Sequence, residues 1–324
     1  MRHLRRIERV SADEESFWVG TGNKIGQLVT KLSSNEYQRV FPTGNHGGVG
    51  TGYLLGCGYG YLSRSLGLAC DNIIAAQIVV SSGEIFEVRD DNEHADLLWA
   101  LRGDGSGQIG IVTGLLLKTY PLSSTPDYSY FRLSWSRSFA GVAVAVWQEW
   151  ALDDDMTSNF TCRIELWNPP EDEEQNFPSV VSEGILYGNQ DELAALLNVV
   201  ISNIGPPMEN TRESFEYMQL LARLYGIAND DTFQVRNPFA GHSGSRRLFY
   251  HKSHMIPTRL GTDGIAALIN FINEILTGSL PYQSYLAMTP LGGVINPLRP
   301  SAFDDQRNSL TIAQYGGSWT TPNQ

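Results

Sequence analysis

A glycine-rich stretch near the beginning of the chain constrains its fold more than any other feature. Between Thr43 and Gly60 lie eight glycines: Gly44, Gly47, Gly48, Gly50, Gly52, Gly56, Gly58 and Gly60. Glycine costs chain entropy on folding, so it is favoured where the backbone needs a positive φ or approaches a ligand closely. Backbone N–H groups in such a loop can form a concave nest for a phosphate or for the carbonyls of a planar ring. Tight strand packing or a surface loop would explain the same glycines, and the loop alone leaves these alternatives open.

Composition and charge narrow the class of partner. The 324 residues are 42% hydrophobic, which is enough for a large core in two domains or one large domain. With 35 acidic and 23 basic residues the net charge is −12, which repels nucleic-acid phosphates and anionic lipid surfaces. No apolar run approaches the ~20 residues that span a bilayer, and no signal-peptide segment follows the basic start. We therefore expect a small-molecule partner, no nucleic acid, no membrane and, by default, a cytoplasmic location.

The cysteines argue against a disulfide framework or a zinc site. There are three of them, Cys57, Cys70 and Cys162, an odd number without the paired spacing of metal ligands. Each is expected to be a small buried residue.

Several other patterns are absent or incomplete. The glycine stretch is neither a G-x-x-x-x-G-K-[ST] loop nor a strand-to-helix G-x-G-x-x-G. The sequence GHSGS around Ser243 departs from the serine-hydrolase pattern G-x-S-x-G. His251 and His254 are three residues apart on an expected strand, so they should face opposite sides and not form a metal pair.

Strands and helices are expected to mix without a regular βαβ rhythm. Strands are predicted over 17–22, 73–88 with a turn at 81–83, 111–122, 128–136 and 159–167. Helices are predicted over 24–33, 94–103, 141–152, 192–204 and 264–276. Asp90 and Asp91 are expected to cap the second helix, and Gly103 to end it. Proline and serine at 121–126 indicate a domain boundary, and the fold class is α+β.

Three motifs in fixed order suggest a family. After the glycine loop come S-R-x-x-G-L-A-x-D-N from Ser63, D-L-x-W-A-L-R-G from Asp96 and G-x-V-T from Gly110. This order resembles the second half of the FAD-binding domain of FAD-linked oxidases of the vanillyl-alcohol-oxidase/PCMH superfamily, in the berberine-bridge-enzyme-like group. A weaker resemblance continues through FYHKSHMI, LAMTPLGGVINPL and AFDDQRNSLTIAQYGGSW, in residues 249–319.

The resemblance implies both an architecture and an activity. Residues 1–122 would form a partial PCMH-type FAD-binding domain without its N-terminal subdomain. Residues 123–324 would form a substrate-binding domain, truncated at its C-terminal end, with an antiparallel sheet covered by helices. The implied function is oxidation of a small-molecule alcohol, amine or secondary metabolite by hydride transfer to flavin N5, with O2 as acceptor. The alternative is a truncated relative that no longer binds flavin and serves as an inactive fragment, a binding module or a non-redox cyclase.

The resemblance also assigns cofactor-binding residues. In the glycine loop these are His46, Gly47, Gly48, Gly50, Gly52, Gly58 and Gly60. A second turn adds Gly105, Gly107, Gly110 and Ile111. Many relatives carry a cysteine that bonds covalently to the flavin, and the matching position here is His46. FAD is therefore expected not to be attached through cysteine, although His46 could simply be a histidine tolerated in a loop.

Two residues are assigned catalytic roles by the same resemblance. Tyr59 matches a tyrosine on the substrate side of the ring, where it would be an acid/base partner or an aromatic wall, with core packing as the alternative. Gln314 matches a glutamine of the sheet next to the flavin, and Ile312 stands where many plant relatives have a lysine. Asp71 and Asn72 match a D-N pair that is expected to fix a loop.

The sequence lacks two family segments. There is no R-S-G-G-H-type loop, which holds the FAD pyrophosphate in relatives, and no returning C-terminal segment. If the chain acts as given, both flanks of the FAD site are expected to be open and the affinity for FAD to be reduced.

Overall fold

The chain forms two compact units. The computed structural model describes residues 3–10, 15–103, 108–122, 128–167, 178–225, 248–277, 283–295, 300–303 and 306–319. Unit 1 consists of Met1–Pro126, Glu216–His242 and Gly293–Arg307, and unit 2 consists of Asp127–Phe215, Ser243–Gly292 and Asn308–Gln324. The chain thus returns twice to unit 1, whereas the sequence suggested one boundary. The assignment of an FAD-binding role to 1–122 and a substrate-binding role to 123–324 stays a prediction.

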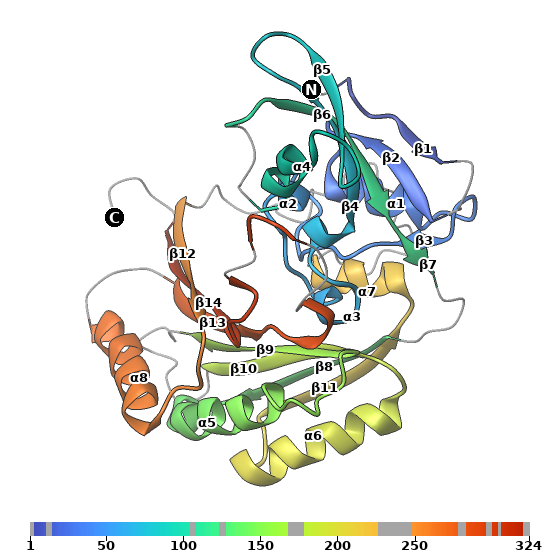
Figure 1. Ribbon diagram of the computed structural model, residues 1–324. Helices are drawn as coiled ribbons and strands as arrows, with labels where there is room; N and C mark the ends of the chain where they lie inside the picture. Colours follow the sequence, from blue (N-terminus) through green and yellow to red (C-terminus); the bar gives the residue numbers. More distant parts are fainter. Residues whose placement is uncertain are drawn as a thin grey trace. The chain divides into compact units, whose positions relative to one another are not determined.

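Unit 1 contains an antiparallel five-stranded sheet in the order β1-β2-β6-β4-β5 (Figure 1). Its strands are β1 (Ile7–Arg9), β2 (Ser16–Gly20), β6 (Ile111–Lys118), β4 (Ile73–Val79) and β5 (Ile85–Arg89). A separate short pair joins β3 (Arg39–Val40) and β7 (Tyr120–Pro121). The predicted strands around 17–22, 73–88 and 111–122 are confirmed.

Short helices complete unit 1. They are α1 (Ile25–Leu32), α2 (Gly52–Leu55), α3 (Ser63–Leu66), η1 (Ala69–Asn72), α4 (Ala95–Leu101), α7 (Tyr217–Leu224) and η3 (Gly293–Ile295). The prediction that Asp90 and Asp91 cap α4 is wrong, because the helix begins after His94 without a side-chain cap. The Asp90 carboxylate instead accepts two hydrogen bonds from Arg102, at 2.6 and 2.9 Å. Gly103 does end this helix region, at a φ of +115°.

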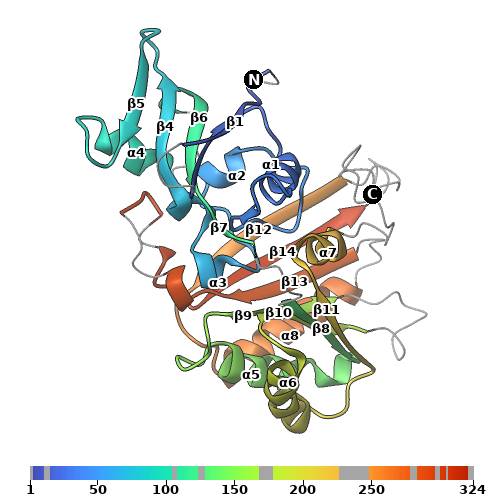
Figure 2. The same cartoon turned by 90° about the vertical axis from the view of Figure 1, so that its right-hand side faces the viewer.

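Unit 2 contains an antiparallel seven-stranded sheet in the order β11-β8-β10-β9-β13-β14-β12. The strands are β8 (Tyr128–Trp135), β9 (Phe160–Trp167), β10 (Val180–Tyr187), β11 (Glu209–Phe215), β12 (Leu248–Ile256), β13 (Gln283–Pro290) and β14 (Thr311–Trp319). Helices α5 (Ala140–Ala151), α6 (Gln190–Ile204) and α8 (Thr262–Thr277), with η2 (Arg137–Phe139) before α5, cover one face (Figures 1 and 2). The α+β class and an antiparallel sheet covered by helices are confirmed.

Tight packing of the helices on the sheet forms the core of unit 2. Phe131 and Phe160 stack in this core, and Trp150 meets Phe160 edge to face with ring centroids 4.8 Å apart. Strands β10 and β11 were not predicted. The first is buried on both faces and lacks alternation, and the second is polar, so neither shows the period-2 pattern of a half-buried strand.

The structure corrects the interpretation of two cysteines. Cys57 and Cys70 form a disulfide, with Cα atoms 4.5 Å apart, and only Cys162 is free and buried. The chain turns back between them, and the Ala69 N–H donates to the Gly58 carbonyl at 2.9 Å. The number of cysteines could not predict this bond, because a disulfide depends on which cysteines the fold brings together. A cross-link closing a loop of this size stabilises a protein by about 3 kcal/mol.

A buried ion pair joins two segments of unit 1 that are far apart in the chain. The guanidinium of Arg307 donates to both oxygens of the Asp71 carboxylate, at 2.5 and 3.1 Å, and both side chains are buried. Arg307 also donates to the Ile295 carbonyl and the Ser301 hydroxyl, while Asp71 accepts from the Leu68 N–H. The predicted loop-fixing role of Asp71 is confirmed by these contacts.

Loss of this pair should destabilise unit 1. We expect Arg307→Met to lower the free energy of unfolding by about 3–5 kcal/mol, because the Asp71 charge stays buried without its partner. Urea unfolding followed by circular dichroism measures the change. Arg89→Met is the matched control, because Arg89 pairs with Glu87 at the surface and its loss should cost under about 1 kcal/mol. Equal losses in the two variants would contradict the role given to the pair.

Candidate functional site

The glycine loop is anchored to the first turn of α1. The N–H groups of Ile25 and Gly26 donate to the carbonyls of Val49 and Gly47, both at 2.9 Å. The Thr51 hydroxyl donates to the Thr21 carbonyl at 3.0 Å. Gly47 and Thr51 are buried, and these hydrogen bonds fix the position of the chain between them.

Some of the predicted cofactor glycines are required by packing inside unit 1. A Cβ atom on Gly58 would collide with the ring of Tyr53, and one on Gly60 would collide with the Thr43 carbonyl. A Cβ atom on Gly47 would lie 3.0 Å from the Tyr225 ring. These contacts explain the three glycines without a ligand, and their part in cofactor binding stays a prediction.

Other glycines of the loop face open space. A Cβ atom on Gly50 or Gly52 would meet nothing within 4 Å. The exposed residues of this part of the loop are His46, Gly48, Val49, Gly50 and Gly52. We call residues 46–52 the open segment. Its backbone can be approached closely by a flat or phosphorylated ligand, which is the property that FAD requires of such a loop.

The second predicted turn is described only in part. Gly105 and Gly107 lie outside the described residues. Gly110 packs against strand β4, where a Cβ atom would lie 2.5 Å from the Val79 carbonyl oxygen. Ile111 begins β6 and is 59% exposed, a large value for an apolar residue.

Tyr59 lies within a group of tyrosines in unit 1. Tyr59 is half-buried. The pKa of the neighbouring Tyr53 is raised well above its ordinary value, first by burial and then by charge interactions with Tyr225 and Tyr59. The Tyr53 ring fills the space beside Gly44 and Gly58. Tyr53 therefore shapes the loop, and the sequence pattern gave no reason to single it out.

Gln314 lies on the face of the unit 2 sheet opposite the helices. It is exposed on β14 and pairs with Ser253 on one side and Ala287 on the other. Ala287 in turn pairs with Glu165, so a small residue separates the Gln314 amide from the Glu165 carboxyl on one face. We call this side of the sheet the polar face.

Aromatic residues occupy the next row of the polar face. Tyr285 stacks on Trp167 with ring centroids 5.1 Å apart, and the His251 ring meets Tyr285 edge to face at 5.4 Å. These rings meet across Gly316, where a Cβ atom would collide with the His251 ring. His254 instead contacts Tyr315, which confirms that the two histidines face opposite sides. In the described part of the chain, no group of three or more His, Cys, Asp or Glu side chains could hold a metal ion.

Glu165 is a buried carboxyl on the polar face that sequence analysis missed. It accepts a hydrogen bond from Trp167 Nε1 at 2.8 Å and pairs with Arg163 at 2.9 Å. Burial raises the pKa of Glu165, and the positive charge of Arg163 only partly opposes this effect. Arg163 also binds Glu183, so its charge is shared between two carboxylates. A carboxyl with a raised pKa beside an exposed amide can bind a hydroxyl or amine and accept a proton.

Comparison with known proteins places these features in a family. The profile of the FAD binding domain matches residues 1–89. An FAD-linked oxidoreductase of Bacillus subtilis is 30% identical over 325 residues, covering 97% of this chain and 64% of the relative. Tetrahydroberberine oxidase of Berberis wilsoniae is 26% identical, covering 98% of this chain and 58% of the relative. The chain is therefore similar over nearly its whole length to berberine-bridge-enzyme-like proteins and FAD-linked oxidoreductases.

The structure agrees with this assignment. The berberine-bridge-enzyme-like protein 1 of Physcomitrella patens superimposes with a TM-score of 0.83 at 25% identity, over 100% of this chain and 66% of the other. The chain thus spans less than two thirds of the length of these relatives. No helix in the described ranges is long and apolar enough to cross a membrane.

The raised pKa of Glu165 predicts a pH-dependent stability. A carboxyl whose pKa is raised in the folded protein contributes stability when the pH is below its ordinary pKa of 4.5. This contribution is lost as the pH rises through the raised pKa. Glu165→Gln removes the free-energy cost of ionising this buried carboxyl and keeps an acceptor for Trp167. Its stability relative to wild type should therefore increase as the pH rises above about 4.5.

Thermal unfolding between pH 4 and pH 8 measures this difference. Glu149→Gln removes the same charge from an exposed site on α5 and controls for the change in net charge. A Glu165→Gln difference that stays flat, or shrinks toward pH 8, would contradict the account of Glu165.

Proposed function

We propose that this chain belongs to an FAD-dependent oxidoreductase that oxidises a small-molecule alcohol, amine or secondary metabolite. The observation that carries the proposal is the accessible backbone of the open segment 46–52, which lies within the region that matches the FAD binding domain. In this segment a Cβ atom on Gly50 or Gly52 would meet no described atom within 4 Å. FAD, when bound, supplies a two-electron acceptor at N5 that takes hydride from a substrate C–H, with O2 as the final acceptor.

The chain's own residues would hold the cofactor through backbone groups. The amides of the open segment, with Gly110 and Ile111 of the second turn, are the proposed contacts. The state of the cysteines supports FAD binding without a bond to cysteine, because Cys57 and Cys70 are bonded to each other and Cys162 is buried in the core of unit 2. His46 lies exposed in the open segment, where it can polarise a ligand.

Substrate contacts are proposed for Tyr59 of unit 1 and, separately, for Gln314 and Glu165 of unit 2. In unit 1, the Tyr59 phenol would donate a hydrogen bond to the substrate or form an aromatic wall. In unit 2, the Gln314 amide would orient a substrate hydroxyl or amine, and Glu165 would accept its proton. The polar face supports these roles because it presents an amide, a carboxyl and stacked aromatic rings in neighbouring rows. Relatives include an oxidase named for an alkaloid and structural neighbours named as oligosaccharide oxidases, which is compatible with an alcohol or amine substrate.

Flavin content tests the proposal. We expect the purified chain, incubated with FAD and desalted, to show flavin absorbance, and Gly50→Val to reduce the bound fraction at least tenfold because its side chain enters the open segment. Gly141→Val is the matched control, since a Cβ atom on Gly141 in α5 also meets nothing within 4 Å. After acid precipitation the flavin should stay in solution.

Two outcomes would contradict these statements separately. A chain that stays colourless at high FAD concentration would contradict flavin binding and favour the non-flavin relative. A yellow pellet containing a flavin bonded to cysteine would contradict the proposed attachment while leaving flavin binding intact.

A further inference from the structure

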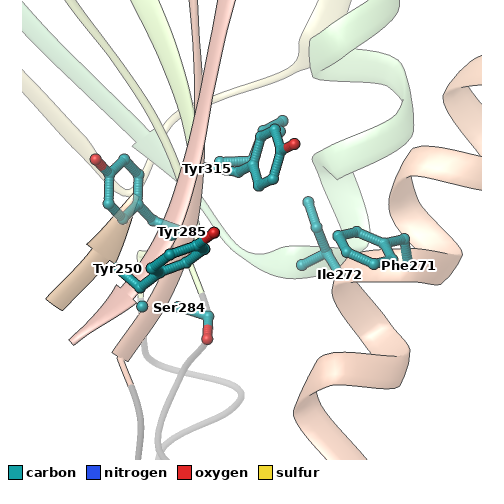
Figure 3. Close-up of a pocket in the computed structure, with 9 residues that line it drawn as sticks. Tyr250, Phe271, Ile272, Ser284, Tyr285 and Tyr315 are labelled. Atoms are coloured by element: carbon teal, nitrogen blue, oxygen red, sulfur yellow. The ribbon is translucent and has the colours of Figure 1, made fainter. Parts of the chain in front are cut away.

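A pocket lies in unit 2 on the face of the sheet covered by helices. It has a volume of about 210 Å³ and is bounded by β12, β13, β14 and α8. Figure 3 shows Tyr250 and Tyr315 on the strands and Phe271 and Ile272 on the helix around this space. Because side chains alternate along a strand, Tyr315 and Gly317 face away from Gln314. Gln314 is therefore not part of the pocket, although Tyr285 and Gly316 of the neighbouring row contribute to its lining.

Gly317 lines the pocket without contributing a side chain to it. Gly317 pairs with Tyr250 on β12 and with Ser284 on β13, so all three lie in one row facing α8. One row closer to the core, Tyr315 and Leu286 fill the corresponding space. Without a side chain at 317, a gap remains between Tyr250, Ser284 and the Phe271–Ile272 edge of α8. Tyr250 and Phe271 are 61% and 50% exposed, so the gap is open to solvent.

The walls of this pocket favour an uncharged aromatic ring. They are predominantly apolar, and the rings of Tyr250, Tyr315 and Phe271 offer edge and face contacts to a planar guest. The Tyr315 hydroxyl is 2.9 Å from His254 Nδ1, which fixes the orientation of the ring. Lys252 Nζ lies 5.8 Å from the centre of the Tyr250 ring, so a cationic ligand would meet a like charge at this wall. The net charge of −12 disfavours an anion.

We propose that this pocket binds a neutral, single-ring aromatic molecule that carries one hydroxyl group, a ligand of the phenol class. The ring would lie over Gly317 between Tyr250 and Phe271, with its hydroxyl toward the Ser284 or Tyr250 hydroxyl. A cavity of about 150 Å³ suffices for benzene in a protein core, so 210 Å³ accommodates a ring with a polar substituent. The site requires neither FAD nor the Gln314 and Glu165 side chains of the polar face.

Fluorine NMR with 4-fluorophenol as the probe tests the proposal on the full chain. We expect saturable binding with a Kd near or below about 1 mM, within the range open to a ligand of this size. Gly317→Val should weaken binding at least tenfold, because its side chain fills the space that the ring would occupy. Gly261→Val is the matched control, since a Cβ atom there meets nothing within 4 Å, and it should bind like wild type. Phe271→Ala removes an exposed wall and should also weaken binding.

The results that overturn the proposal are distinct from those that support it. Unchanged affinity in both Gly317→Val and Phe271→Ala, or no saturable binding at several millimolar probe, would overturn it. Binding that is lost in Gln314→Ala but kept in Gly317→Val would place the probe on the polar face and overturn it as well. If circular dichroism shows that Gly317→Val is unfolded, Phe271→Ala alone decides.

Discussion

The buried pair between Asp71 and Arg307 is the contact on which the arrangement of unit 1 depends. It joins residues 236 positions apart in the chain and brings the returning segment Gly293–Arg307 against η1. In turn, η1 holds the glycine loop, through the Cys57–Cys70 disulfide and the Ala69 N–H bonded to the Gly58 carbonyl. The open segment thus depends on contacts made by residues outside it. A flexible glycine-rich backbone can present a defined binding surface only when its other side is fixed in this way.

The two faces of the unit 2 sheet show how one strand can serve two chemistries. Along β14, Gln314 and Gly316 face the polar face, whereas Ala313, Tyr315 and Gly317 face the helices. The polar face carries buried charge, and burial raises the pKa of Glu165 there. The opposite face carries the apolar core and the aromatic pocket. This separation follows from strand alternation alone.

The sequence predicted the regular elements and the family but not the reason for each glycine. Strong periodicity located α6, α8 and the half-buried strands, whereas the buried strand β10 and the polar strand β11 lack a pattern that could locate them. Gly58 and Gly60 looked like ligand contacts, yet the Tyr53 ring and the Thr43 carbonyl already require them. The disulfide depends on how the chain folds back between Cys57 and Cys70, and the burial of Glu165 depends on the strands beside it, which no local pattern contains.

Hydrogen exchange of the full chain with and without FAD tests the central claim, that the open segment 46–52 holds the cofactor, most directly. The account predicts that FAD slows exchange of the backbone amides within 46–52 by at least tenfold, while amides of the β10 core in unit 2 are unaffected. Unchanged exchange within 46–52 at a concentration of FAD that saturates the protein would contradict it.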